Sequence, residues 1–252
     1  MAKSAVDPTP VASADPTPVP GGYLHWSRDA AVGLFAVLPL WILYEVLRWL
    51  LAPEDRNGAE VLLLQELSRF GDRGHLVASG AFAVLVLVAA RSLVRRHIPW
   101  LRVAAVIALE GTVYALMLGP LTSALTASAT RLLAVDPAHG PLVANLVGSL
   151  GAGIFEELVF RLGLMSLLVW IGLRGCRAWS LPRGFALAFA VVVSGLVFSW
   201  FHHLCGQPFE RSVFVYRTIA GMLLGLLMWA RGYGVCVYTH AVYDVYFYLS
   251  PP

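Results

Sequence analysis

Seven long apolar segments, separated by short polar connections, dominate the sequence. A helix needs about 20 predominantly apolar residues to cross a membrane. Segments near this length occur at residues 30–51, 75–94, 101–120, 142–172, 185–204, 213–230 and 233–249. Hydrophobic residues make up 58% of the 252 residues and charged residues only 13%, whereas charged residues form about a quarter of a soluble domain. We therefore expect an all-α fold, a polytopic transmembrane helix bundle of about seven spans.

The number of spans depends on two of these segments. Residues 142–172 exceed the length of one untilted span and contain Gly148, Gly151 and Gly153, at which a helix could break. Residues 233–249 are short for a span. Six or eight spans are therefore also compatible with the sequence.

The sequence divides into three regions. Residues 1–28 are rich in proline and repeat the phrase Asp-Pro-Thr-Pro, so we expect a disordered tail that buries too little apolar surface to fold. Residues 29–141 contain the first transmembrane helices. Residues 142–252 contain the ionisable groups that carry the functional argument.

Charge and cysteine content exclude two classes of function. The net charge is +3 with a single lysine, and no basic run could follow a phosphate backbone, so nucleic-acid binding is excluded. The cysteines at 176, 205 and 236 are isolated and lack the spacing of a metal finger, so we interpret them as small buried residues.

Arginine distribution predicts the orientation. Arginines cluster in the second and fourth connections, which favours a cytoplasmic N-terminus because cytoplasmic loops are enriched in positive charge. The arginine-rich, nearly lysine-free composition weakly favours a GC-rich bacterium and hence the bacterial inner membrane as the cell membrane concerned.

Three ionisable residues lie inside the apolar segment 142–172. Glu156, Glu157 and Arg161 would each cost about 2.5–3.5 kcal/mol at a bilayer centre if unpaired. Glu157 and Arg161 are four residues apart and can form an ion pair on one helix face. Glu156 points about 100° away from Glu157 on an α-helix and is available as a proton acceptor.

Two further polar groups lie in later spans. His202 and His203 end the segment 185–204, and their side chains diverge by about 100°, so we expect one of them to face a site. His240 and Asp244 share a helix face in the last span, where Asp244 could accept a hydrogen bond from one ring nitrogen and fix the tautomer. Taken alone, each group is also explained as an interfacial or packing feature.

In order, the phrases Glu156-Glu157-xxx-Arg161, Phe198-xxx-His202 and His240-xxx-Asp244 resemble the CPBP (ABI) family of intramembrane proteases. This family includes the CAAX prenyl endopeptidases and bacterial branches such as the myxosortase-like enzymes. The resemblance covers residues 142–249 and makes 142–252 a CPBP-like intramembrane protease domain.

The resemblance implies a catalytic role for four of these residues. Glu156 with His202 would activate a water molecule, while His240 and Asp244 would stabilise the oxyanion. Glu157 and Arg161 would support the helix and its electrostatics.

The sequence leaves two chemical questions open. Many family members have asparagine at position 244, and an ionised aspartate cannot donate a hydrogen bond to an oxyanion. Asp244 is therefore either protonated or acts by orienting His240. Glu156, His202, His240 and Asp244 could also form a divalent zinc site, but the sequence has no HExxH phrase, and we favour a glutamic-type mechanism without a cofactor over a metallo-type one.

The resemblance implies an intramembrane endopeptidase that acts on a membrane-anchored or lipidated protein or peptide, with the lipid bilayer as its environment. C-terminal protein sorting is one role that the myxosortase-like branch suggests. The alternative is a non-catalytic membrane protein that uses the buried Glu/Arg cluster, either a proton-coupled transporter or a helix-binding scaffold.

The depths of the site residues disagree with the predicted spans. Counted from the cytoplasmic ends, Glu156 and His202 lie about 16 residues deep and His240 about 7, a mismatch of roughly 14 Å at 1.5 Å per residue. We expect an error in a span boundary, or else a connection at Arg231–Gly234 that re-enters the membrane.

Overall fold

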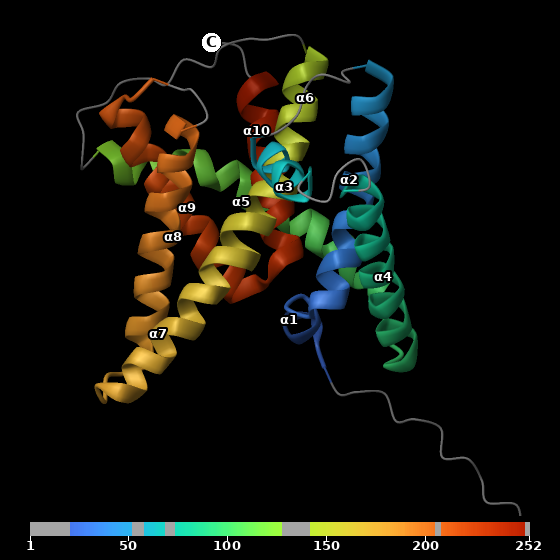
Figure 1. Ribbon diagram of the computed structural model, residues 1–252, viewed down its shortest axis with the longest axis horizontal. Coiled ribbons are helices and arrows are strands. Elements are labelled where there is room, and N and C mark those ends of the chain that lie inside the picture. The colour runs from blue at the N-terminus through green and yellow to red at the C-terminus, as the bar shows by residue number, and fades with distance from the viewer. Residues whose placement is uncertain (1–20, 52–57, 69–73, 128–141, 205–207, 250–252) are drawn as a thin grey trace, which may run out of the picture.

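The structure is a computed structural model that describes residues 21–51, 58–68, 74–127, 142–204 and 208–249 (Figure 1). It is 90% helical, and the described residues contain no strand. This confirms the predicted all-α helix bundle.

The described residues form a succession of helices. In chain order they are α1 (Tyr23–Trp26), α2 (Ala30–Leu51), α3 (Gly58–Ser68), α4 (Gly74–Arg95), α5 (Trp100–Ala127), α6 (Leu142–Gly151), the π-helix η2 (Ala152–Met165), α7 (Ser166–Ala178), α8 (Gly184–Leu204), α9 (Arg211–Arg231) and α10 (Tyr233–Leu249).

Each of the seven apolar segments coincides with a helix or a continuous run of helices. In the described part of the chain, four helices are both long and apolar enough to cross a membrane, namely α2, α5, α8 and α9. The last helix, α10, has 17 residues. The chain is thus a polytopic membrane protein, and the count of seven spans stays a prediction.

The segment 142–172 does not break at its glycines. Helices α6, η2 and α7 form one continuous helical run, with Gly151 in the right-handed helical conformation (φ −61°, ψ −42°) (Figure 1). Gly153 instead permits close packing, because an added Cβ would lie 2.6 Å from Cβ of Ala241 and 2.9 Å from the carbonyl oxygen of Val237 on α10. The glycine serves the contact between η2 and α10.

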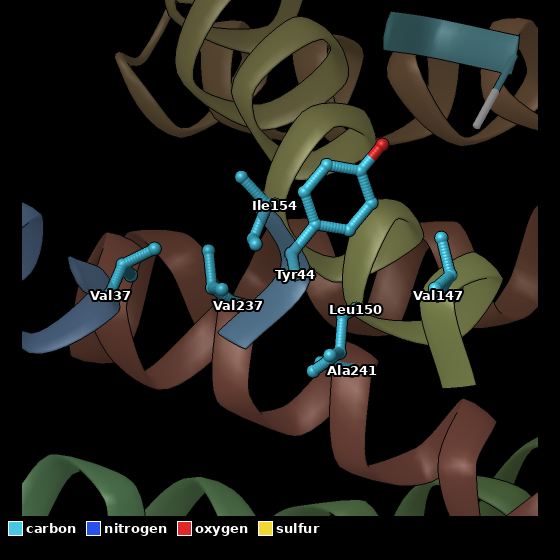
Figure 2. Packing of buried hydrophobic residues seen from close by; sticks show 7 residues of the cluster. All are labelled: Val37, Tyr44, Val147, Leu150, Ile154, Val237 and Ala241. Carbon is cyan, nitrogen blue, oxygen red and sulfur yellow. The ribbon is translucent and has the colours of Figure 1, made fainter. Parts of the chain in front are cut away.

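Helix α10 lies at the centre of the packing. It contacts α2, α5, α6, α9 and η2. Figure 2 shows apolar side chains from four elements meeting around α10. They are Val37 and Tyr44 of α2, Val147 and Leu150 of α6, Ile154 of η2, and Val237 and Ala241 of α10.

A second buried cluster joins the N-terminal helices to α10. Its members are Val32, Ala36, Leu93, Ile98, Val103, Ile107 and Val235. The expected boundary between residues 29–141 and 142–252 falls at residues outside those described, and it remains a prediction. The helices on its two sides nevertheless share buried cores.

The expected disordered tail, residues 1–28, is corrected at its end. Tyr23–Trp26 form the short helix α1, and Ser27 is fully buried. Nε of Arg28 donates a hydrogen bond of 2.6 Å to the carbonyl oxygen of Ala230, at the end of α9. These contacts over a long sequence separation order the segment, whereas residues 1–20 lie outside the described part.

The connection between α9 and α10 is buried. Gly232 connects the two helices with φ +91°, and an added Cβ there would lie 2.5 Å from the carbonyl oxygen of Ser27. Arg231 forms a bidentate ion pair with Glu110, near the middle of α5, at 2.6 and 2.7 Å. The boundaries of α9 and α10 agree with the predicted ones within two residues, so a boundary error there does not explain the depth mismatch. The turn itself lies inside the bundle.

Candidate active site

Glu157 and Arg161 form the ion pair that their spacing predicted. Nη1 of Arg161 lies 2.8 Å from Oε1 of Glu157, and both side chains are fully buried. Nη2 of Arg161 also donates to the carbonyl oxygen of Gly221 on α9 at 3.3 Å. Because an unpaired buried charge is costly, each side chain compensates the charge of the other, and the bond to Gly221 connects η2 to α9.

Glu157 has two further partners on α10. Nδ1 of His240 lies 2.6 Å from Oε1 of Glu157, and the thiol of Cys236 donates to Oε2 at 2.9 Å. A carboxylate that accepts from Nδ1 orients the ring and directs Nε2 to the opposite side. The sequence indicates only the contact with Arg161, because residues 83 positions apart give no spacing signal.

Glu156 lies where α8 and α10 meet η2. Its Oε2 atom is 3.8 Å from Nε2 of His202 and 4.0 Å from Nε2 of His240, and its side chain is almost fully buried. Both imidazoles therefore direct the same ring nitrogen toward one carboxylate oxygen. The three residues that the sequence motifs singled out on separate spans converge here.

The orientation of His202 comes from its own helix. Nδ1 lies 2.9 Å from the carbonyl oxygen of Phe198, one turn earlier in α8. A carbonyl oxygen can only accept, so Nδ1 carries the proton and a neutral ring presents Nε2 as an acceptor. The ring of Phe198 packs edge-on against both His202 and His240, with centroids 4.9 and 6.0 Å apart.

Phe198 also contacts the buried ion pair. The guanidinium carbon of Arg161 lies 4.2 Å from the centre of the Phe198 ring. This is within the range of a cation–π interaction. Phe198 thus connects Arg161 to both histidines of the candidate site.

Asp244 lies beside His240 at a longer distance than expected. Its Oδ2 atom is 3.6 Å from Nε2 of His240, beyond hydrogen-bond range. The sequence suggested that Asp244 fixes the His240 tautomer. In the structure Glu157 holds Nδ1, so this part of the prediction is corrected.

His203 points away from the site. Its ring packs against Phe209 and Phe214, with centroids 5.1 and 6.0 Å apart, and against Trp200. The adjacent histidines therefore face different surroundings, as the helical divergence predicted.

Four side chains of the site are the candidates for a zinc site, namely those of Glu156, His202, His240 and Asp244. The described residues include no group of three or more His, Cys, Asp or Glu side chains arranged to hold a metal ion. Oε2 of Glu156 lies 3.8 Å from Nε2 of His202 and 4.0 Å from Nε2 of His240, and Oδ2 of Asp244 lies 3.6 Å from Nε2 of His240. The choice between a glutamic-type and a metallo-type mechanism stays a prediction.

The close approach of α8 and α9 brings His202 to the site. An added Cβ on Gly221 would lie 3.1 Å from the Cα of Gly195 and 3.1 Å from the Phe198 ring. Ser199 donates to the carbonyl oxygen of Phe214 at 2.8 Å. Gly221 therefore permits the close packing of α8 against α9.

Comparison with known proteins supports the resemblance found in the motifs. Residues 137–246, somewhat less than half of the chain, match the model of the Rce1-like family, described as type II CAAX prenyl endopeptidase. No curated protein and no solved structure matches the chain. The family match does not identify the myxosortase-like branch.

The matched region contains η2, α8 and α10, the three helices that carry Glu156, His202 and His240. Several apolar helices of membrane-spanning length accompany this region. Residues 137–246 therefore resemble the type II CAAX prenyl endopeptidases of the Rce1-like family, and the chain is a multi-pass membrane protein.

Proposed function

We propose that the protein hydrolyses a peptide bond in a membrane-anchored or lipidated protein, with Glu156 as the general base. The observation that carries the proposal is the convergence of three side chains. Oε2 of Glu156 lies 3.8 and 4.0 Å from Nε2 of His202 and His240, and the three residues come from three different helices. All three residues lie within the region that matches the family.

Glu156 and His202 together activate the water molecule in this mechanism. Their separation exceeds a direct hydrogen bond but allows one water oxygen to bond to both at about 2.8 Å. Glu156 takes a proton from the water while His202 Nε2 orients it. The resulting hydroxide attacks the scissile carbonyl carbon, and Glu156 then donates the proton to the leaving amine.

His240 and Asp244 stabilise the negative oxygen of the tetrahedral intermediate. Glu157 accepts from Nδ1 of His240, so a ring protonated on both nitrogens donates from Nε2. Asp244 lies on the same side of the ring, 3.6 Å from Nε2. Asp244 supplies a second hydrogen bond as a carboxylic acid, because the ionised form has no proton to donate.

The proposed mechanism uses no metal ion. It is supported by the donor arrangement, since no group of three or more ligating side chains in the described residues is arranged to hold a metal ion. Glu156 therefore acts as a base rather than as a ligand. The substrate class is a protein or peptide anchored in the bilayer, and removal of C-terminal sorting tails is one form that this activity takes in the proposal.

The protein resides in a cell membrane, by this proposal the bacterial inner membrane, with its N-terminus in the cytoplasm. Support comes from the arginines of the second and fourth connections. Accessibility of an N-terminal tag to protease in sealed, oriented vesicles tests the orientation.

The central test replaces Glu156 with glutamine. The amide side chain keeps the shape of the carboxylate but cannot take a proton, so peptide cleavage should fall at least 10²-fold, on the order expected for losing a general base. Mass spectrometry of membrane proteins from cells with the wild type or Glu156→Gln would show tails that are retained only in the variant.

Two neighbouring histidines provide the matched control. His202→Gln should lose cleavage, whereas His203→Gln, whose ring packs against Phe209 and Phe214, should keep it within about twofold. Full cleavage by Glu156→Gln would reject the proposal. If that result came with proton-coupled uptake in proteoliposomes, it would support a transporter instead.

A further inference from the structure

Arg217 is a second arginine of α9 near the candidate site, and no sequence motif includes it. It is partly exposed, unlike the fully buried Arg161. Its position follows from the register of α9 against the two neighbouring helices.

The register between α8 and α9 places Arg217 beside His202. Gly221 contacts Gly195 and Phe198, and the carbonyl of Phe214 accepts from Ser199, so the two helices run antiparallel. His202 lies one turn beyond Phe198, and Arg217 lies one turn before Gly221. These two turns therefore face each other.

The register between α9 and α10 places Arg217 near Asp244. Cys236 donates to the carbonyl oxygen of Leu224 at 3.3 Å, and the hydroxyls of Tyr216 and Tyr243 lie 2.6 Å apart. These two contacts place Tyr216 of α9 beside Tyr243 of α10, and Leu224 of α9 beside Cys236 of α10. Arg217 is therefore level with the turn that carries Asp244.

Electrostatics agree with this placement. Arg217 lies within coulombic range of the carboxylates of Glu156 and Asp244. It opposes a positive charge on His202. The guanidinium thus lies within electrostatic range of the reacting groups, on the side where α8, α9 and α10 meet.

The two arginines differ in what they can offer a substrate. Arg161 is fully buried between Glu157, the Phe198 ring and the Gly221 carbonyl oxygen. Arg217 is only partly buried, and the register of α9 against α10 places it level with the site. A guanidinium binds a carboxylate through two parallel hydrogen bonds, which fixes both position and direction.

We propose that Arg217 binds the C-terminal carboxylate of the substrate and thereby selects peptide bonds close to the end of the substrate chain. This proposal rests on the endopeptidase function proposed above. A carboxylate that enters an apolar, membrane-embedded site is costly unless a cation pairs with it. The free chain end is an anion that every C-terminal tail carries, whatever its side chains.

The competing explanation is that Arg217 only balances the charges of Glu156 and Asp244. In that case its loss would impair the site for every substrate alike. Carboxylate binding predicts a loss confined to substrates with a free chain end. The two explanations therefore differ in one ratio, that between the cleavage rates of substrates with and without a free C-terminal carboxylate, measured on the same enzyme.

The test uses two matched pools of peptides. Each peptide carries a prenylated cysteine followed by three randomised residues, and one pool ends in a free carboxylate while the other ends in a carboxamide. Full-length protein in liposomes is given each pool, and mass spectrometry measures kcat/KM. The variants are Arg217→Gln, Arg217→Lys and, as a control on an exposed arginine of the same helix, Arg211→Gln.

We expect the wild type to prefer the acid pool by about 10- to 100-fold, mainly through KM, as for the loss of one charge-assisted pair. Arg217→Gln should lose this preference, so that its kcat/KM falls about 10- to 100-fold more on the acid pool than on the amide pool. Arg217→Lys should keep part of the preference, and Arg211→Gln all of it.

Equal cleavage of both pools by the wild type would overturn the proposal without any variant. An equal loss on both pools in Arg217→Gln would also overturn it, in favour of charge balance. Failure of the proposed function would look different, because the wild type would cleave neither pool or Glu156→Gln would cleave both.

Discussion

Glu157 and Arg161 offer the sharpest test of how the site is built. Both side chains are fully buried and lie 2.8 Å apart. Replacing Glu157 with methionine leaves the Arg161 charge buried without its counter-charge. Breaking a buried pair from one side costs about 3–5 kcal/mol. At roughly 2–4 °C per kcal/mol for a chain of this size, the melting temperature should fall by roughly 6–20 °C.

The double variant Glu157→Met/Arg161→Met removes both charges and keeps similar volumes. Replacing a whole buried pair by apolar residues is often neutral, so most of the lost stability should return. Activity should not return, because Nδ1 of His240 loses the carboxylate that orients it at 2.6 Å. Loss of such an orienting partner lowers activity by about 10- to 100-fold.

The measurement combines thermal unfolding of the detergent-solubilised protein with cleavage of a prenylated peptide. A double-mutant cycle from the wild type, the two single variants and the double variant isolates the coupling energy. Strictly additive stability losses would refute the reasoning. So would a double variant that recovers full activity, since His240 would then not depend on Glu157.

Three other perturbations have outcomes set by local charge and geometry. Asp244→Asn, which keeps a donor, should retain more cleavage of a prenylated peptide than Asp244→Ala, and the opposite order would contradict the oxyanion role. The Arg96 guanidinium donates a hydrogen bond to Asp29 and holds the pKa of that carboxyl below its usual 3.8. The pair therefore stabilises the protein above about pH 4, and this stabilisation is lost as the pH falls through the lowered pKa. Asp29→Asn should therefore lower thermal stability at pH 7, and this difference should shrink below about pH 4, whereas a constant difference would contradict the assignment. Treatment with the chelator phenanthroline should leave cleavage unchanged, while inhibition reversed by zinc would require a metal-based mechanism.

The span-forming helices were predictable because their cause is local. In lipid the backbone N–H and C=O groups of a single spanning segment must form hydrogen bonds within that segment, so a long apolar run specifies a helix by itself. The predicted segments 30–51 and 233–249 have the bounds of α2 and α10. The same logic predicted the Glu157–Arg161 pair, since positions four apart meet on any helix.

Some local features were not predictable from the sequence. The glycines at 148, 151 and 153 could break a helix, yet α6, η2 and α7 are continuous. Glycine weakens a helix but also permits close contact, and only the position of α10 shows which effect applies at Gly153. Likewise α1 forms because Arg28 and Ser27 pack against the α9–α10 turn.

The sequence by itself determined the membrane-embedded helical architecture, the Glu157–Arg161 pair and the set of polar residues from which a site could be built. Only the tertiary structure decided that Glu157 holds His240, that Arg231 pairs with Glu110, and that Arg217 lies level with Asp244. The physical reason is range. Helical periodicity fixes contacts within a turn or two, whereas contacts between helices depend on packing that joins residues up to 202 positions apart.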